Sequence, residues 1–355
     1  MQNPSPTNHR ATTQAMKHLL QAAFALLLSA TAAHAGTAPA SMLVNPVYDL
    51  RDGRQSYLTL TNISPTQSID VRVVWVSEAG CREYARVVRL APGDTTVRSA
   101  SLDLYGPQGA HPQGARQGWC YAYAIRQPGG VEARGTPVAF NQLVGRMLVQ
   151  DALTLHDYEV APWAFTSPMA AHAETDVDGD QLLDLDGREY ERAPDTVYIP
   201  RFLGQVGGTA ASSDLVLLNL TGGREFDVTA SLAVFNDDGA YFDATTSFRC
   251  WTRRGLAQYS SAFTNAFLLA SNDEPTESFG VRESGWFRID GVRAQTSQDS
   301  EANPVILAAL IEGTQGVLGG SPPANATEQH SVQVQPYALG EQSNGSLLGR
   351  GLTYH

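Results

Sequence analysis

Short runs that alternate apolar and polar residues dominate the chain after residue 40. The clearest are "SYLTLTNIS" from Ser56 to Ser64 and "IDVRVVWVS" from Ile69 to Ser77. Further runs are "ARVVRL", "GWCYAYAI" and "TPVAFNQLVG", and they are separated by turn clusters such as "SEAG", "APGD" and "RQPGG". Short strand-like runs at this spacing predict an all-β sandwich or barrel.

The same order of runs occurs a second time further along the chain. "DLVLLNLT" matches "YLTLTNIS", and Asn219 follows Asn62 by 157 residues. "SGWFRIDGV" then matches "QGWCYAYAI", and Trp286 follows Trp119 by 167 residues. The spacing between matching residues is thus 157 in the first block and 167 in the second. Such a single change in spacing is expected for a duplicated domain with one loop insertion. The alternative is chance similarity between strand-rich segments.

The repeated asparagines and tryptophans have simple structural explanations. Each asparagine ends a strand and begins a turn, where its side chain is suited to capping its own backbone. Asn62 and Asn219 also begin glycosylation sequons, as do Asn325 and Asn344, but the turn explains the first two more simply. Each tryptophan follows a glycine at a strand start and is predicted to anchor a β-sandwich core.

These patterns predict two tandem β-sandwich domains, Ig-like or jelly-roll-like, related by internal duplication and joined by an acidic connector. The predicted segments are a signal peptide (1–35), domain 1 (43–160), the connector (161–195), domain 2 (196–338) and a flexible tail (339–355). Helix is scarce, and "SSAFTNAFLLASN" from Ser260 to Asn272 fits either a helix or a strand with a loop. The general pattern resembles exported bacterial tandem β-sandwich proteins of uncharacterised function, a resemblance that implies no activity.

The first 35 residues have the features of a secretory signal. A basic start precedes an apolar run from Leu19 to Leu28, and Ala33-His34-Ala35 forms an A-x-A cleavage site. The alternative is a retained anchor, but the apolar run is short for a bilayer. The sequence therefore predicts export to the periplasm or the extracellular space, without a transmembrane anchor.

The charge of the chain limits its partners. The formal net charge is −12, and it becomes −14 without Arg10 and Lys17 of the signal. An acidic surface argues against nucleic acid as a partner. A cell-surface protein or a polysaccharide remains as the kind of partner to expect.

The three cysteines predict one disulfide, because export permits such bonds. Cys81 and Cys120 lie in predicted domain 1 and are the expected pair. Cys250 lies in predicted domain 2, where it would be a buried thiol or an intermolecular link.

The connector contains the densest acidic cluster, "TDVDGDQLLDLDGREYE" from Thr175 to Glu191. Calcium takes six to eight oxygen ligands, and carboxylates at alternate positions of a tight loop supply them. The D-x-D-x-D-x-x-x-D spacing resembles the calcium loops of integrin-type and thrombospondin type 3 repeats, which implies calcium. The expected ligands are Asp176, Asp178, Asp180, the backbone carbonyl of Leu182, and Asp184.

Two positions depart from the usual calcium loop. Gln181 occupies position six, where glycine normally permits a left-handed turn, at a cost of about 1 kcal/mol. Gly187 occupies position twelve, so the usual bidentate glutamate is missing, and Glu189 or Asp186 would have to replace it. The alternative is a solvated acidic linker, although the three leucines of "LLDL" (Leu182, Leu183 and Leu185) favour a folded loop over a purely solvated one.

No enzyme signature is present: the sequence lacks G-x-S-x-G, H-E-x-x-H, a P-loop and a dinucleotide fingerprint. His156-Asp157 with Glu159 is more typical of a polar strand end than of a base with its orienting acid. We expect a non-enzymatic surface or secreted protein with a binding or structural role. The alternatives are a secreted hydrolase on a β scaffold and a carbohydrate-binding module. The aromatic candidates for such a module are Trp163, Tyr105 and Trp251.

Overall fold

The computed structural model describes residues 38–105, 115–126, 135–151, 156–206, 213–222, 225–272, 283–315 and 329–347. The described residues all belong to one compact unit. The predicted signal peptide lies outside them. In this part of the chain, no helix combines the length and the apolar character needed to cross a membrane.

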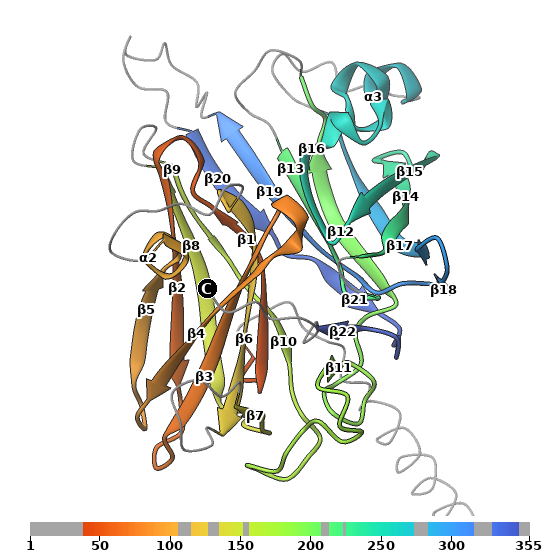
Figure 1. Ribbon diagram of the computed structural model, residues 1–355. Helices are drawn as coiled ribbons and strands as arrows, with labels where there is room; N and C mark the ends of the chain where they lie inside the picture. The colour runs from red at the N-terminus through yellow and green to blue at the C-terminus, as the bar shows by residue number, and fades with distance from the viewer. Residues whose placement is uncertain are drawn as a thin grey trace, which may run out of the picture. The chain divides into compact units, whose positions relative to one another are not determined.

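The N-terminal half of the described chain forms two antiparallel sheets (Figure 1). Sheet I has the order β5-β2-β8-β9. Its strands are β2 (Arg54–Asn62), β5 (Thr95–Ser99), β8 (Leu143–Asp151) and β9 (His156–Val160). Sheet II has the order β10-β1-β6-β3-β4, and β7 pairs with β6. Its strands are β1 (Met42–Asp49), β3 (Ile69–Ser77), β4 (Glu83–Leu90), β6 (Gln117–Arg126), β7 (Thr136–Pro137) and β10 (Trp163–Phe165).

The C-terminal half also forms two antiparallel sheets. Sheet III has the order β16-β13-β19-β20. Its strands are β13 (Ser213–Asn219), β16 (Trp251–Gly255), β19 (Ile306–Gln315) and β20 (Gln329–Val334). Sheet IV has the order β21-β12-β17-β14-β15, and β18 pairs with β17. Its strands are β12 (Thr196–Leu203), β14 (Asp227–Asn236), β15 (Tyr241–Arg249), β17 (Ser284–Gln295), β18 (Ser300–Ala302) and β21 (Tyr337–Leu339).

The remaining elements are short. A two-stranded ribbon joins β11 (Leu183–Asp184) to β22 (Ser346–Leu347). The helical pieces are η1 (Arg51–Gly53), η2 (Ala79–Cys81), α2 (Ala100–Tyr105), η4 (Leu256–Gln258), η5 (Ser261–Phe263) and α3 (Asn265–Ser271). The ambiguous segment from Ser260 to Asn272 is therefore helical. Thr264 begins α3, because its hydroxyl accepts the backbone N–H of Phe267.

Strand order is the same in the two halves. From edge to edge, sheet II runs β10-β1-β6-β3-β4 and sheet IV runs β21-β12-β17-β14-β15, so each strand has a counterpart in the chain order of its half. Sheets I and III correspond in the same way, and the short β7 and β18 occupy matching places on β6 and β17. The mainly β character predicted from the alternating runs is confirmed.

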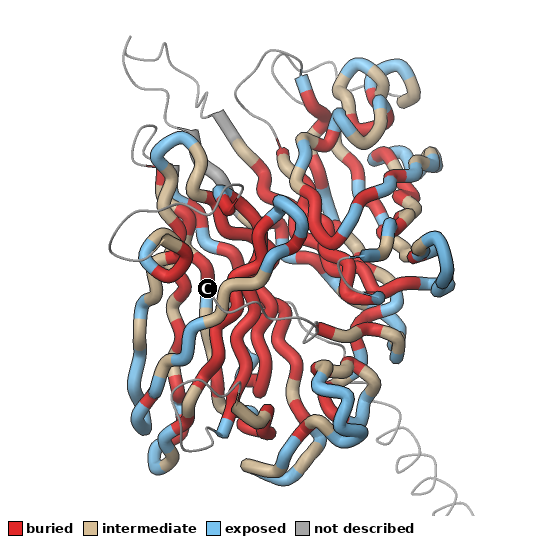
Figure 2. Tube along the Cα trace, viewed as in Figure 1, coloured by how far each residue is buried: buried red, intermediate tan, exposed pale blue. Residues whose placement is uncertain are grey.

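Sheet II contacts sheets I and III, sheet III contacts sheet IV, and the edge strands β9 and β20 also bring sheets I and III together. Strand β1 of sheet II contacts β2 and β8 of sheet I, and β19 of sheet III contacts β12 and β17 of sheet IV. Between sheets II and III, the indole N–H of Trp163 donates to the carbonyl of Ala308 over 3.2 Å. In return, the indole N–H of Trp251 donates to the carbonyl of Pro46 over 2.8 Å. Exposed strand residues are found mainly on β4 and β5 in the N-terminal half and on β15 and β17 in the C-terminal half (Figure 2).

A buried ionic cluster also joins sheets II and III. The fully buried carboxylate of Asp49 accepts hydrogen bonds from Arg51, Arg54 and Arg253, the last at 3.0 Å. Arg253 lies on β16 and also donates to the hydroxyl of Tyr158 over 3.1 Å. Burial alone would raise the pKa of Asp49, but the hydrogen bond from Arg51 and the charge of Arg253 lower it below its usual value. Several partners are needed because one cation rarely repays the desolvation of a buried carboxylate.

The predicted disulfide between Cys81 and Cys120 is wrong. Cys81 bonds to Cys250, across 169 residues and between the two halves of the chain. Cys120 is a buried thiol in the middle of β6, where it lies between Asn45 on β1 and Trp75 on β3. Cys81 instead lies in η2, just after β3, where the chain meets the C-terminal half.

The paired tryptophans do not share one role. Trp119 is only 4% exposed and belongs to the core, as predicted. Trp286 is 36% exposed, so the prediction that it anchors a core is wrong. Trp286 is exposed because it lies on the outer face of sheet IV, where it stacks against Phe235 with ring centroids 4.1 Å apart.

Candidate metal centre

The aspartate cluster lies in the connector between β10 and β12, and the connector is folded against the end of the chain. Strand β11 pairs with β22, and the N–H of Leu185 donates to the carbonyl of Gly345 over 2.8 Å. Leu183 and Leu185 are both buried, while Leu182 is half-buried. The leucines of the loop therefore pack as expected for a folded segment, and residues 341–347 of the predicted flexible tail include its partner strand.

Aspartate side chains shape the loop itself. Asp176 accepts the backbone N–H groups of Gly179 and Gln181 over 2.8 and 3.2 Å, one with each carboxylate oxygen. Asp180 accepts the N–H of Leu182 over 2.7 Å. Gln181 has a φ of +66°, so position six adopts the left-handed conformation that the sequence required of it. These turns bend the backbone so that alternate carboxylates face a common region.

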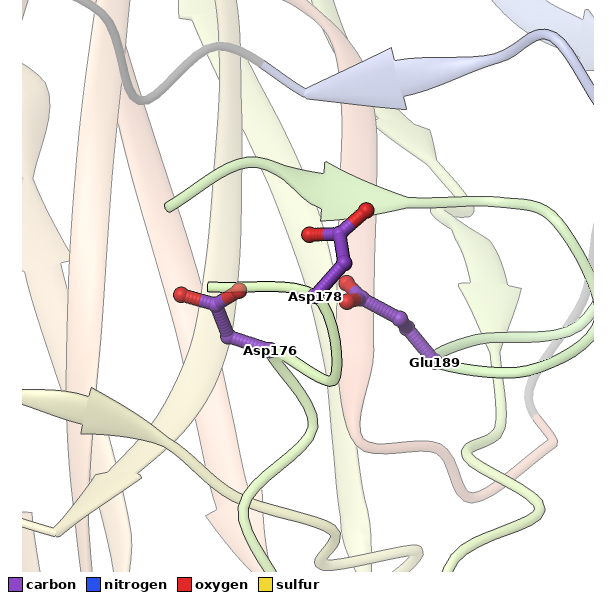
Figure 3. A group of neighbouring side chains, drawn as sticks. All are labelled: Asp176, Asp178 and Glu189. Atoms are coloured by element: carbon purple, nitrogen blue, oxygen red, sulfur yellow. The ribbon is translucent and has the colours of Figure 1, made fainter. Parts of the chain in front are cut away.

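Two overlapping groups of carboxylates converge in the loop. Each group has its candidate ligand atoms within 4.8 Å of one another, and Asp178 belongs to both. The first group consists of Asp176, Asp178 and Glu189, and Figure 3 shows its three side chains together. The second consists of Asp178, Asp180 and Asp184. Each of the four predicted aspartates thus belongs to at least one of the two groups, but neither group contains all four, and the carbonyl of Leu182 stays a prediction.

Glu189 contributes the buried member of the cluster. It is 2% exposed, and its carboxylate accepts the N–H of Val177 over 2.7 Å and that of Asp184 over 3.0 Å. Asp186, the other candidate for the missing position twelve, instead accepts the N–H of Arg188 over 2.7 Å and belongs to neither group. Of the two residues, Glu189 is therefore placed to supply the missing acidic oxygen.

The proton affinities of the cluster reflect its crowding. Burial and the charges of the neighbouring aspartates, Asp180 and Asp178 foremost, raise the pKa of Asp184 to about 6. Burial raises the pKa of Glu189 to about 7, against the lowering effect of its two backbone hydrogen bonds. Carboxylates that resist ionising together are stabilised in their charged form by a bound cation.

Several contacts tie the connector to both halves of the protein. Tyr190 is fully buried, and its hydroxyl bonds to that of Thr175 over 3.1 Å. The N–H of Glu191 donates to the carbonyl of Thr166, just beyond β10. On the other side, an isolated bridge joins Ala193 to Gln342. A change in the loop would therefore be transmitted to segments from both halves.

The aromatic residues suggested for carbohydrate binding are not exposed. Trp163 and Trp251 are buried at the contact between sheets II and III, and Tyr105 is half-buried with its hydroxyl donating to the carbonyl of Ala115. The prediction of these rings as an exposed set is wrong. Tyr241 is not among the predicted residues, yet it is exposed on β15 and contacts Phe235 with ring centroids 5.3 Å apart. Its place in an alternating strand was the available signal.

His156 begins strand β9, in agreement with the strand-end interpretation. The acids beside it have other partners. Asp157 accepts a hydrogen bond from Gln150 over 3.1 Å, and Glu159 pairs with Arg146 at 2.8 Å.

Comparison with known proteins adds no precedent for this site. The sequence matches no protein-family model, and no curated protein matches it.

Proposed function

We propose that the protein is an exported, non-enzymatic binding or structural protein whose acidic connector binds calcium. The ligands would be Asp176, Asp178, Asp180, Asp184 and the carbonyl of Leu182, with Glu189 in place of the missing glutamate. The observation that carries the proposal is the buried Glu189 carboxylate, which two backbone N–H groups hold beside Asp176 and Asp178. Hard oxygen ligands at this density suit calcium better than magnesium, which retains more of its waters.

We also propose that the two halves are tandem β-sandwich domains that arose by duplication. Their matching strand orders support this. The repeated asparagines support it further, since each accepts the N–H of the residue two positions on. Asn62 accepts from Ser64 over 2.9 Å, and Asn219 accepts from Thr221 over 3.0 Å. Both asparagines are buried, which favours the turn role over glycosylation.

Export is supported by the disulfide between Cys81 and Cys250, since such bonds persist in oxidising compartments. Outside the cell or in the periplasm, a loop of modest affinity can be occupied, because extracellular calcium modules often bind weakly. The role of the ion would be to hold the connector against the C-terminal segment. Metal binding would then be coupled to folding of the loop.

Thermal melting of the mature chain in calcium and in chelator tests the proposal. A ligand that binds only the folded state stabilises it by about 2.7 kcal/mol at a hundredfold its Kd. We expect calcium to raise the melting temperature of the wild type, and expect Asp178→Ala and Glu189→Gln to abolish most of the shift. Asp243→Ala, an exposed aspartate on β15, is the matched control and should keep it. An unchanged wild-type melting temperature and unchanged proteolysis of the connector would refute calcium binding.

A polysaccharide ligand is the second candidate, and the exposed face of sheet IV favours it. Trp286 stacks on Phe235, and Tyr198 lies 6.3 Å from Trp286 between ring centroids. Arg288 and Asp290 pair beside these rings at 2.8 Å and could bond to hydroxyl groups. Affinity electrophoresis through neutral polysaccharide gels, with Trp286→Ala as the variant, tests it. Equal migration of wild type and variant in every gel would remove this candidate.

A further inference from the structure

The two halves of the protein have an aspartate–arginine pair at the same place in their sheets. Asp70 on β3 lies opposite Arg89 on β4, and Asp227 on β14 lies opposite Arg249 on β15. Each aspartate is also paired with the end of the central strand on its other side. Asp70 pairs with Ile125 of β6, and Asp227 pairs with Gln295 of β17. A cavity lies over the pair in each half, which permits a direct comparison of two equivalent positions.

The two pairs differ in how fully the arginine is used. Arg249 donates to both carboxylate oxygens of Asp227, over 2.8 and 3.0 Å. Arg89 reaches Asp70 through one nitrogen only, at 3.5 Å, and its side chain is 72% exposed. Both donors on one side of the Arg249 guanidinium group therefore bind its own aspartate, whereas the guanidinium group of Arg89 has donors available for another acceptor.

The N-terminal cavity has a second guanidinium group. Arg126 lines it beside Arg89 and, among the residues that the structure describes, forms an ion pair with Glu174 at the long distance of 3.9 Å. Solvent-exposed ion pairs contribute only about 0–1 kcal/mol, so a better-placed acceptor can compete with them. The C-terminal cavity differs in charge, because Glu225 joins Asp227 and Arg249 in its lining.

An imidazole is held over the same cavity by backbone contacts. The N–H of His172 donates to the carbonyl of Ala139 over 2.8 Å, and the N–H of Ala139 donates to the carbonyl of Ala173 over 2.9 Å. His172 has a φ of +63°, a left-handed conformation that costs a residue with a side chain about 1 kcal/mol. Strain of this kind persists where the surroundings fix it, and it often accompanies binding sites.

Three aliphatic side chains contribute a small apolar area to the floor of the cavity. Ile69, Ile125 and Val138 line it, and all three are almost completely buried. The cavity volume is about 230 Å³, below the roughly 300–1,000 Å³ of sites for drug-sized molecules. An apolar floor under two guanidinium groups suits a small molecule with a short hydrophobic body and one anionic end.

We infer that this cavity binds a small organic carboxylate. The carboxylate group lies between Arg89 and Arg126, whose planar forks match its two oxygens, and the imidazole of His172 adds a polar contact. The hydrophobic body lies on the three aliphatic side chains of the floor. The aliphatic part of the floor gives an organic acid a contact that inorganic phosphate cannot make. The site uses none of the proposed calcium ligands, although His172 belongs to the same connector, and it gives the chain a ligand as well as an ion.

Isothermal titration of the mature protein with benzoate tests the inference. We expect binding at concentrations up to about 10 mM, and at least tenfold weaker binding in Arg89→Gln and Arg126→Gln, which corresponds to about 1.4 kcal/mol. His172→Asn should weaken binding less, and asparagine tolerates the left-handed backbone. Arg249→Gln, at the equivalent place in the C-terminal half, is the matched control and should bind like the wild type.

Several results would overturn the inference. Benzamide that binds as tightly as benzoate would show that the negative charge is not recognised. Inorganic phosphate that binds as tightly would show a general anion site with no use for the apolar floor. Equal losses in Arg249→Gln and Arg126→Gln would place the effect outside this cavity, and no detectable heat with benzoate would remove the site.

Discussion

Sheets II and IV have the same strand order but different surroundings. All eight residues of β1 in sheet II are buried, whereas its counterpart β12 in sheet IV has only three buried residues among half-buried and exposed ones. The equivalent tryptophans follow this difference, since Trp119 is 4% exposed and Trp286 is 36% exposed. The central strands of sheet II contact both sheet I and sheet III, while the contacts of sheet IV with another sheet are to sheet III.

This difference explains the two hydrophobic patterns in the chain. A sheet covered on both faces needs almost continuous apolar strands, such as "VRVVWV" in β3. A sheet at the end of a stack needs a polar outer face, as terminal units of repeat proteins do. One strand order is thus compatible with both patterns, and the position of the sheet decides which pattern its strands have.

Replacing the two tryptophans gives the strongest test of this comparison. Trp119→Ala should reduce the free energy of unfolding by about 3–5 kcal/mol, because it leaves a cavity between covered sheets. Trp286→Ala should cost less than about 1 kcal/mol, because solvent already reaches its ring. Urea denaturation measures both changes. Equal losses for the two variants would contradict the assignment of covered and open faces.

Arginine substitutions test the contact between sheets II and III with a somewhat smaller effect. Arg253→Ala removes one partner of the buried Asp49 and should cost about 2–3 kcal/mol, below the full loss for a broken buried pair because Arg51 and Arg54 remain. Arg249→Ala, one strand earlier, breaks an exposed pair and should cost about 0–1 kcal/mol. The same urea titration compares the two variants. If Arg253→Ala left the free energy of unfolding unchanged, the ionic cluster would not be what holds the sheets together.

The pH dependence of the connector without calcium should give the smallest effect. The pKa of Asp184 is raised to about 6 and that of Glu189 to about 7, so the folded connector binds more protons than the unfolded one. The stability that these two raised pKa values contribute to the connector is fully present below the ordinary carboxyl pKa near 4, and it is lost as the pH rises to about 7. Hydrogen exchange at Leu185 and Tyr190, corrected for the intrinsic rate, measures the loss.

Glu189→Gln should flatten this dependence, since glutamine does not titrate. Because Tyr190 is fully buried and lies near Tyr123 of sheet II, loosening of the connector should also uncover that end of the sheet. Protection that increases from pH 5 to pH 8 in chelator would contradict the sign of the effect.

The sequence predicted the strands well because alternation is a local property. Strand β3 begins and ends at the residues predicted for it, and the aspartates of the loop were located by spacing alone. The disulfide could not be predicted in the same way. Cys81 and Cys120 share one half of the chain, but the partner of Cys81 depends on which face of sheet II meets sheet III.

The same limit applies to the carboxylate cavity. Arg89, Arg126 and His172 come from β4, β6 and the connector, and no spacing in the sequence links them. Their convergence follows from the pairing of Asp70 with both Arg89 and Ile125 across two strand borders. Contacts that depend on register and on packing between layers require the three-dimensional arrangement.

The covered face of sheet II has a consequence for biosynthesis. The N-terminal half leaves the ribosome first. Sheet III, which later packs against sheet II, is formed by residues from Ser213 onward. Until those residues emerge, Trp163 and its neighbours have no partner layer, and Cys81 has no Cys250 to oxidise with. The nascent chain therefore exposes an aromatic surface and a reduced thiol at the same time. A chaperone that binds unfolded segments would protect this state from aggregation.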